Sequence, residues 1–212
     1  MTTSKPFGLL LATMEPPANI DEEFQDWYDS EHFPERQGCP GFLTAHRFVC
    51  IEGWPRYLAM YDLESVEVLH GEGYRKIAHA KYSAWTHRIM TKVWGQYRAE
   101  GVQIYHGDSL HGKRGGSSRL ALWRFRGIAA GDESAVVSGL RKLYEERVET
   151  VQLRVFRVSP VSTGDYLAMA ELSAPVAFAS LSPLGTAAKH VDLLNTYTAY
   201  TRQAPGAFPK TS

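Results

Sequence analysis

Short apolar runs that end at proline or glycine alternate with amphipathic stretches along the first half of the chain. Such a run is typical of a buried strand, because proline cannot continue the hydrogen-bonded ladder. Apolar residues that recur at intervals of three and four instead predict a helix. In this half the pattern predicts helical stretches at residues 21–32 and 65–82, and strands at residues 7–14, 42–51, 56–63 and 91–97, the last extending toward residue 105.

The second half of the chain repeats this order of elements. Helices are predicted at residues 132–148 and 174–184, and strands at residues 119–125, 151–158, 165–172 and 191–200. The letters YLAM occur at residues 57–60 and again at residues 166–169, each within the predicted third strand of its half. The agreement of all elements in order indicates an internal duplication.

Each half has the order βαββαβ, which is the order of a ferredoxin-like unit. One such sheet with helices on a single face leaves its other face bare, and two sheets can cover each other's bare faces. The strand at residues 56–63 is apolar on both faces, as expected for a sheet that is covered on both sides. The predicted fold class is therefore α+β, with two ferredoxin-like βαββαβ repeats packed sheet to sheet as a barrel within one chain.

The predicted boundaries place repeat 1, which holds the candidate site, at residues 1–105, and a degenerate repeat 2 at residues 119–202. Residues 106–118 are rich in glycine, serine and histidine and predict a linker, in which His106 and His111 are expected to be solvated. Residues 203–212 form the predicted tail. A monomer with an internal pseudo-dimer is expected, although an outer edge or helix face could still form a homodimer.

The composition narrows the range of partners. Lys and Arg total 23, as do Asp and Glu, and no local basic patch is present, which argues against nucleic-acid and membrane binding. The apolar runs are too short to span a membrane, and the first residues lack the apolar core of a signal peptide, so a cytoplasmic protein is expected. Cys39 and Cys50 have neither metal-type nor CxxC spacing and are expected to be reduced thiols.

The richest candidate chemistry lies at residues 27–42, WYDSEHFPERQGCPGF, at the end of the first predicted helix. Pro34 disfavours a helical conformation of the residue before it, so the helix is expected to end or kink near His32. Histidine is the side chain best suited to moving a proton near neutral pH. His32 is therefore the candidate general acid/base, and Asp29 or Glu35 could orient its ring. The alternative is a partly buried histidine that only fixes the turn.

Further candidates for substrate contact come from the first helix and two neighbouring strands: Trp27, Tyr28, His46, Arg47, Tyr57 and Tyr61. In this hypothesis His46 faces the same cavity as His32, and the aromatic rings form the apolar wall of that cavity. Arg47 would hold an anionic group of the substrate. Structural alternatives stay open, because aromatic residues also suit a core and arginines are commonly solvated. A metal site is not expected, since the proline interrupts the regular spacing of carboxylates around the histidine.

Three segments, WYDSEHFPER, PGFLTAHRF and PRYLAMYDLES, resemble the EthD-like members of the dimeric α/β-barrel group. The resemblance covers about residues 6–105, and it reaches residues 119–202 only through the order of elements and YLAM. It implies ferredoxin-like halves packed sheet to sheet and a first-helix histidine that faces a pocket, which corresponds to His32. The group includes cofactor-free oxygenases, polyketide cyclases, lactone isomerases and haem-degrading enzymes. The second half lacks the corresponding histidine, so the pocket chemistry is expected in the first half alone.

These observations favour a cofactor-independent enzyme that acts on a small apolar, oxygenated or aromatic molecule, with His32 as general acid/base. Isomerisation, dehydration, cyclisation and oxygenation all remain open, because the fold alone does not select a reaction. A non-catalytic small-molecule carrier or sensor is the alternative hypothesis, and a haem-handling protein is the third. A small-molecule ligand is the expected partner, with neither a cofactor nor a metal.

Overall fold

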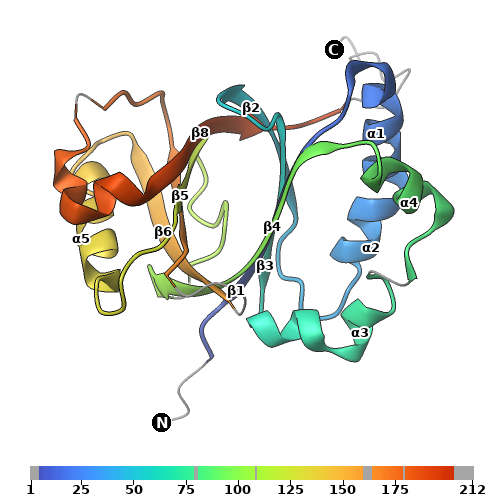
Figure 1. Cartoon of the computed structure of the whole chain (residues 1–212), viewed down its shortest axis with the longest axis horizontal. Coiled ribbons are helices and arrows are strands. Elements are labelled where there is room, and N and C mark those ends of the chain that lie inside the picture. The colour runs from blue at the N-terminus through green and yellow to red at the C-terminus, as the bar shows by residue number, and fades with distance from the viewer. Residues whose placement is uncertain (1–4, 79–80, 108, 160–163, 179, 203–212) are drawn as a thin grey trace, which may run out of the picture.

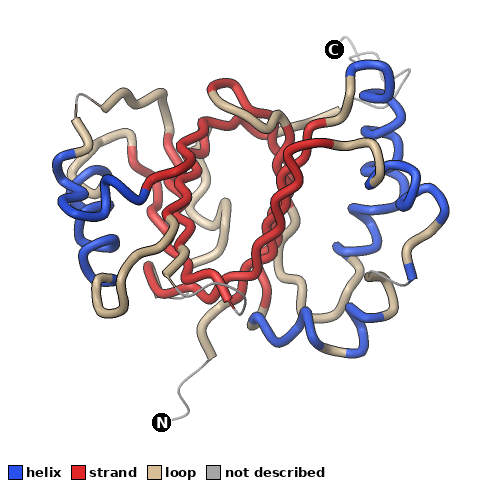
Figure 2. The backbone as a smooth tube through the Cα atoms, in the orientation of Figure 1, coloured by secondary structure: helices blue, strands red, loops and turns tan. Residues whose placement is uncertain are grey.

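The computed structural model describes residues 5–78, 81–107, 109–159, 164–178 and 180–202. Within these residues the strands close into an antiparallel barrel with the order β1-β3-β2-β8-β5-β7-β6-β4. The helices pack against two opposite sides of this barrel, so that the strands form a central ring between two helical layers (Figures 1 and 2). The predicted tail at residues 203–212 lies outside the described residues.

The first half supplies four strands of the barrel and most of the helices. Its elements are β1 (Gly8–Glu15), η1 (Ala18–Ile20), α1 (Asp21–Trp27), the π-helical turn η2 (Tyr28–His32), α2 (Phe33–Gln37), β2 (His46–Glu52), β3 (Tyr57–Leu63), η3 (Val66–His70), α3 (Glu72–Arg75), α4 (Ala84–Met90) and β4 (Trp94–Tyr105). The single helical stretch predicted at residues 65–82 is thus several short helices, of which α4 lies beyond the predicted end.

The second half supplies the other four strands. Its elements are β5 (Arg119–Phe125), α5 (Glu133–Tyr144), β6 (Thr150–Ser159), β7 (Tyr166–Leu172), the 3₁₀ segment η5 (Ser182–His190) and β8 (Val191–Ala199). The helix predicted at residues 174–184 is wrong in position, because the helical residues begin at Ser182. Each half has the strand order fourth, first, third, second, and the predicted ferredoxin-like α+β fold is confirmed.

Two seams join the halves into one closed barrel. Strand β2 pairs with β8, and strand β4 pairs with β6, both antiparallel. Every strand therefore has two neighbours, and the barrel has no unpaired sheet edge within the described residues. Closure within one chain is the arrangement that the sequence predicts for two half-covered sheets.

The two YLAM segments occupy matching positions in the barrel. Both lie at the start of a third strand, β3 or β7, and every residue of these two strands is buried. In each strand the leucine and methionine of YLAM belong to the barrel interior, whereas its tyrosine and alanine face a helical layer. The prediction that the third strand is covered on both faces is confirmed.

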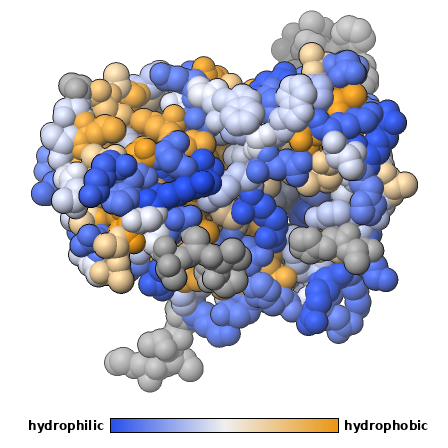
Figure 3. Space-filling model, in the orientation of Figure 1, coloured by the Kyte–Doolittle hydropathy of each residue, from blue (hydrophilic) through white to orange (hydrophobic). Residues whose placement is uncertain are grey.

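Three apolar clusters follow from this alternation. One fills the barrel and includes Leu9, Leu58, Met60, Phe156 and Met169. The other two lie between the barrel wall and the helices of each half. Figure 3 shows a largely hydrophilic outer surface over the first-half helices, with apolar side chains gathering over the half that carries α5. None of the helices in the described part of the chain is long and apolar enough to cross a membrane.

Candidate functional site

The helix that carries His32 changes type near this residue and does not end there. Helix α1 passes into the π-helical turn η2, which is followed by α2 up to Gln37. Pro34 lacks an N–H group, and its ring would meet the carbonyl of the preceding turn in a regular α-helix. The wider π-helical turn before Pro34 accommodates this conflict, and such turns are frequent at functional sites.

The ring of His32 is buried within the first helical layer. The side chain is 7% exposed, and its ring centroid lies 4.1 Å from that of Trp27 and 5.2 Å from that of Tyr28. Trp27 is itself fixed by a hydrogen bond from its Nε1 to Thr86 Oγ1, 2.9 Å long. The Nδ1 atom of His32 is buried and has no hydrogen-bond partner among the described residues. An unpaired buried nitrogen is costly, and such a group in a native structure is a candidate for a functional role.

Burial holds the pKa of His32 well below its ordinary value, and the nearby charges of Arg36 and Arg47 lower that pKa further. The ring is therefore neutral at pH 7, although its position in the last turn of η2 would by itself favour the imidazolium. Arg36 is almost fully buried and reaches both the backbone oxygen of His32, at 3.4 Å, and the carboxylate of Glu35, at 3.1 Å. A neutral imidazole can accept a proton at one ring nitrogen.

His32 borders a pocket of about 500 Å³, part of which opens to solvent, between the barrel wall and the first-half helices. Most of its lining is apolar or aromatic, and the lining residues are Leu10, Ala12, Thr13, Met14, Tyr28, His32, Arg36, Tyr61, Tyr74, Tyr82, Met90, Gln96, Tyr97 and Arg98. The hydroxyl of Tyr61 is also buried without a hydrogen-bond partner in the described residues. Burial raises the pKa of Tyr61 well above its ordinary value, so this hydroxyl stays protonated. A neutral imidazole and a neutral phenol therefore border one pocket.

Asp29 does not orient the ring of His32, contrary to one sequence-based expectation. Its carboxylate pairs with Arg47, which also donates to the side chain of Gln25. The guanidinium of Arg47 lies between two aromatic rings, 4.3 Å from the centroid of Tyr28 and 4.5 Å from that of Tyr200. Arg47 is thus a buried structural cation that fixes Tyr28, and it does not line the pocket.

His46 does not face the cavity beside His32, and this expectation is wrong. Residues alternate between the two faces of β2, so His46 lies on the barrel-interior side with Phe48, while Arg47 lies on the helix side. The His46 ring lies 4.4 Å from the ring of His111. Tyr57 lies on the helix side of β3, but its hydroxyl donates to Asp21, and it does not line the pocket either. Trp27 does not line the pocket, and its ring packs against the ring of His32.

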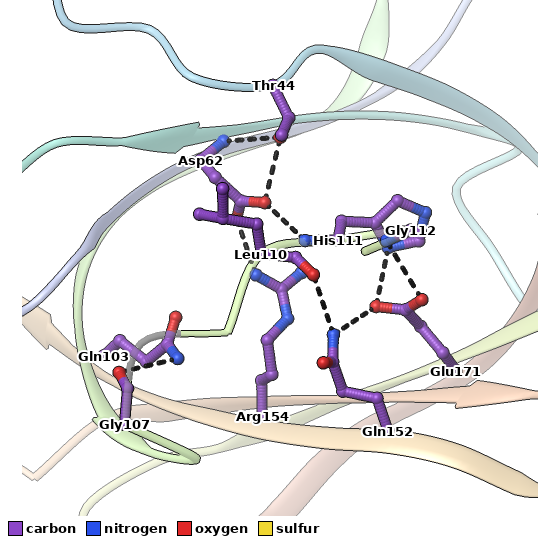
Figure 4. A network of polar contacts seen from close by, with 10 residues as sticks. All are labelled: Thr44, Asp62, Gln103, Gly107, Leu110, His111, Gly112, Gln152, Arg154 and Glu171. Carbon is purple, nitrogen blue, oxygen red and sulfur yellow. Dashed lines mark hydrogen bonds and ion pairs between the residues drawn. The ribbon is translucent and has the colours of Figure 1, made fainter. Parts of the chain in front are cut away.

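The predicted linker closes one end of the barrel with a buried polar network that the sequence analysis missed (Figure 4). Arg154 Nη1 lies 2.6 Å from Asp62 Oδ1, and both side chains are almost fully buried. The backbone N–H of His111 donates to Asp62, and the ring Nδ1 of His111 lies 3.1 Å from Glu171 Oε1. The side chain of His111 is 8% exposed, so the prediction that it is solvated is wrong, whereas His106 is exposed as predicted.

One sequence signal points to this network. Asp62 and Glu171 each stand five residues after the tyrosine of a YLAM segment, on the barrel-interior face of β3 and β7. An acidic side chain at an inward position of an otherwise apolar strand requires a buried partner. Two backbone N–H groups of the linker donate hydrogen bonds to these carboxylates. That of His111 binds Asp62, and that of Gly112 binds Glu171.

The described residues contain no cluster of three or more histidine, cysteine or acidic side chains arranged to hold a metal ion. Cys39 and Cys50 are both free thiols. Burial raises the pKa of the Cys39 thiol, which leaves it a weak nucleophile. The pocket chemistry therefore depends on His32, Tyr61 and the nearby cation of Arg36.

The fold is that of a dimeric α/β barrel, completed here within one chain. A scan of protein-family models finds no match, and a search of curated proteins finds none. Among solved structures, the chain is similar to an anthrone oxidase-like protein, with 10% identity, a TM-score of 0.61 and coverage of 93% of this chain and 92% of that one. At so low an identity the likeness establishes the fold alone.

Two further solved structures have similar coverage. A chlorite dismutase variant from Candidatus Nitrospira defluvii has 10% identity and a TM-score of 0.59, over 94% of this chain and 92% of that one. A heme-binding protein from Thermus thermophilus has 8% identity and a TM-score of 0.54, over 93% of this chain and 92% of that one. All three span almost the whole length of the chain, so the fold match includes both halves.

Proposed function

We propose that the chain is a cofactor-independent enzyme that removes a proton from a small, largely apolar aromatic or oxygenated molecule bound beside His32. The observation that supports this proposal is the buried Nδ1 of His32, which has no hydrogen-bond partner among the described residues and belongs to a ring at the border of an apolar pocket. The depressed pKa of His32 keeps this ring in the neutral form that accepts protons.

The chemical step follows from the groups around the pocket. A C–H or O–H bond of the substrate breaks, its proton moves to the imidazole of His32, and the electron pair stays on the substrate as an enolate or phenolate. The Tyr61 hydroxyl is a neutral donor in the same pocket and can hydrogen-bond the oxygen on which this charge develops. Reprotonation elsewhere gives isomerisation, whereas reaction of the anion with molecular oxygen as co-substrate gives oxygenation.

The substrate class follows from the pocket walls. Leu10, Ala12, Met14 and Met90 suit a flat apolar body, and several tyrosine rings can stack on an aromatic one. The name of the anthrone oxidase-like relative suggests a usable probe, because anthrone is a flat aromatic ketone with an acidic C–H bond.

The decisive experiment measures turnover of anthrone by the wild type, His32→Gln and His87→Gln, with oxygen uptake and absorbance as readouts. His87 is an exposed histidine of α4 and serves as the matched control. Loss of a general base slows the reaction about 100-fold to 10,000-fold, so His32→Gln is expected to lose nearly all turnover and His87→Gln none. If His32→Gln turns over at the wild-type rate, His32 is not the base.

A non-catalytic carrier on the same pocket is the alternative. It predicts that the purified protein retains a small molecule and releases it chemically unchanged, which native mass spectrometry followed by extraction would detect. The same measurement on His32→Gln separates the two functions. A carrier keeps most of its ligand when a single polar contact is removed, whereas an enzyme is expected to accumulate unreacted substrate only in the variant.

Haem handling is the second alternative, and the unpartnered nitrogen of His32 favours it specifically. A histidine ring nitrogen is a common axial ligand of haem iron, and the Nδ1 of His32 has no hydrogen-bond partner among the described residues. Addition of haem to the protein would give a shifted Soret band that is absent in His32→Gln. The absence of any spectral shift in the wild type would exclude this function.

We also propose that the chain arose by internal duplication. An internal duplication of an EthD-like ferredoxin unit, with repeats at residues 1–105 and 119–202 around the connecting residues 106–118, is supported by the matching places of the YLAM segments. Separate expression of the two repeats tests whether each repeat forms one half of the barrel, because each bare sheet should then associate with the other repeat or aggregate.

A further inference from the structure

The barrel has a second hollow at the end opposite to the linker network. It lies where β1 and β5 end and where β3, β4 and β8 begin, and its volume is about 1020 Å³, including the part open to solvent. The residues that line it are Thr13, Trp54, Pro55, Gly95, Gln96, Tyr97, Arg124, Arg126, Asp192, Leu193, Leu194 and Asn195. We call this hollow the barrel mouth. Barrel mouths are among the common places for small-molecule sites.

The barrel mouth contains arginines because of the register of β5. Leu120 and Leu122 belong to the barrel interior, so the alternate positions that follow, Arg124 and Arg126, continue the same row toward the opening. The side chain of Arg124 is 15% exposed, and that of Arg126 is 51% exposed. One guanidinium therefore lies within the mouth, and the other lies at its rim.

The two arginines share a single carboxylate. Arg124 Nε lies 2.8 Å from Asp192 Oδ1, and Arg126 Nε lies 3.0 Å from Asp192 Oδ2. The terminal Nη groups of both arginines form no hydrogen bond with any described residue. Several planar donors therefore remain unpaired in the mouth, and a carboxylate is the group that such paired guanidinium donors bind best.

An aromatic wall lies beside these cations. The ring centroid of Tyr97 is 4.4 Å from Arg124 Cζ and 5.9 Å from Arg126 Cζ. The Tyr97 hydroxyl is buried and has no hydrogen-bond partner in the described part of the chain. Cation–π contacts hold the guanidinium planes in place, which lowers the ordering cost when an anion binds.

Two partly exposed apolar side chains also line the mouth. Trp54 is 56% exposed, and Leu194 is 38% exposed. The indole of Trp54 packs on the backbone of Gly95, because a Cβ at that glycine would come within 2.6 Å of the ring. The backbone oxygen of Trp54 accepts a hydrogen bond from Asn195 Nδ2, 2.9 Å long. A large exposed ring that is held in place in this way offers a stacking surface.

We propose that the barrel mouth binds a small aromatic monocarboxylate, whose carboxylate pairs with Arg124 and Arg126 and whose ring lies against Trp54. This site is separate from the chemistry proposed for His32, since neither arginine lines the His32 pocket. Thr13, Gln96 and Tyr97 line both hollows, so the two sites adjoin along β1 and β4.

The test is calorimetric titration of the full chain with 2-naphthoate and, as the uncharged analogue, with 2-naphthalenemethanol. Binding of 2-naphthoate at one site is expected, with affinity at least about tenfold higher than that of the alcohol. Arg126→Gln and Trp54→Leu should each weaken binding about tenfold or more. Asp192→Asn should instead tighten it a few-fold, because it removes the carboxylate that competes for both guanidinium groups.

Two controls locate the site. Arg157→Gln removes a similarly exposed arginine that is paired with Glu133 elsewhere on the surface, and it should leave the affinity unchanged. His32→Gln should also leave it unchanged. No binding of 2-naphthoate, equal affinity in Arg126→Gln, or loss of binding in His32→Gln would each overturn the proposal. Sedimentation velocity excludes the competing explanation, since a dimer that dissociates in Trp54→Leu would make the mouth an interface between two copies.

Discussion

The guanidinium of Arg154, in the second half of the chain, lies 2.6 Å from the carboxylate of Asp62, in the first half, and both are buried inside the barrel. The same carboxylate accepts hydrogen bonds from the hydroxyl of Thr44 and from the backbone of His111 (Figure 4). One buried ion pair thus holds β3, β6 and the connecting loop together. Two further nitrogens of Arg154 lack hydrogen-bond partners among the described residues, so its charge depends heavily on Asp62.

Asp62→Asn should destabilise the protein severely. Removal of one partner leaves the other charge buried and uncompensated, which costs about 3 to 5 kcal/mol. Urea unfolding followed by circular dichroism measures the change in the free energy of unfolding. The double variant Asp62→Asn with Arg154→Met should be more stable than Asp62→Asn alone, because it removes the orphaned cation.

The control for this prediction is the exposed pair of Arg157 and Glu133. Arg157→Gln is expected to change the free energy of unfolding by less than about 1 kcal/mol, since exposed ion pairs contribute little. An Asp62→Asn variant that unfolds at the same urea concentration as Arg157→Gln would show that the buried pair does not hold the halves together.

The sequence predicts the strands well and the barrel interior poorly, for a physical reason. A strand that is buried on both faces is typically a near-continuous apolar run, which residues 57–63 and 166–172 both display apart from Asp62 and Glu171. The run RVFRV around Arg154 has the same character as an exposed strand, because alternation alone does not reveal which face turns inward. The partner that makes burial of Arg154 tolerable, Asp62, is distant in the sequence, and local patterns carry no information about such a pairing.

The candidate site shows the same limit. The position of His32 beside a pocket follows from local features, namely the helix, Pro34 and the aromatic spacing before them. The expectation that His46 shares this pocket fails because the register of β2 turns His46 into the barrel. Alternation along β2 places His46 and Phe48 on one face, but it does not reveal whether this face turns toward the helices or toward the barrel interior.

His46 should make stability depend on pH in the acid range. Burial lowers its pKa from 6.5 to about 4, with a smaller contribution from His111, while the carboxylates of Asp62 and Glu171 act in the opposite direction. The unfolded chain therefore binds a proton at His46 below pH 6.5 that the folded protein binds only near pH 4. Stability should fall as the pH is lowered from 6.5 toward 4, and His46→Gln should lose less over this range.

Urea midpoints at pH 7, 6, 5 and 4.5 test this dependence, with His87→Gln as the control at an exposed histidine. Wild type and His87→Gln should show parallel profiles, and His46→Gln should show a flatter one. Parallel profiles for all three proteins would mean that His46 titrates alike in the folded and unfolded states.

Arg47→Lys should weaken the contact between helix α1 and the segment after β8. The guanidinium stacks between Tyr28 and Tyr200 and also pairs with Asp29, and an ammonium cannot reproduce this planar arrangement. The expected loss is about 1 to 2 kcal/mol in the free energy of unfolding, from cation–π and charged hydrogen-bond contributions.

Arg88→Lys supplies the matched comparison, because Arg88 pairs with Glu23 at an exposed position of α4 and stacks on no ring described in the structure. It should unfold within about 0.5 kcal/mol of the wild type. Equal losses in Arg47→Lys and Arg88→Lys would show that stacking on the two tyrosines adds nothing to the charge pair.

Gly139→Ala tests the contact between α5 and η5. In an exposed helix this change stabilises by about 1 kcal/mol, because glycine has the lower helix propensity. At Gly139 a Cβ would come within 2.8 Å of Leu184 Cα and 2.9 Å of the Pro183 backbone oxygen, and backbone atoms cannot move aside as a flexible side chain can. Overpacking of this kind costs about 1 to 3 kcal/mol, so a net loss of stability is expected.

Ser138→Ala, at the adjacent exposed position, should stay within about 0.5 kcal/mol of the wild type. Thermal and urea unfolding of the two alanine variants decide the matter, and a Gly139→Ala protein as stable as Ser138→Ala would mean that the two segments are not in close backbone contact.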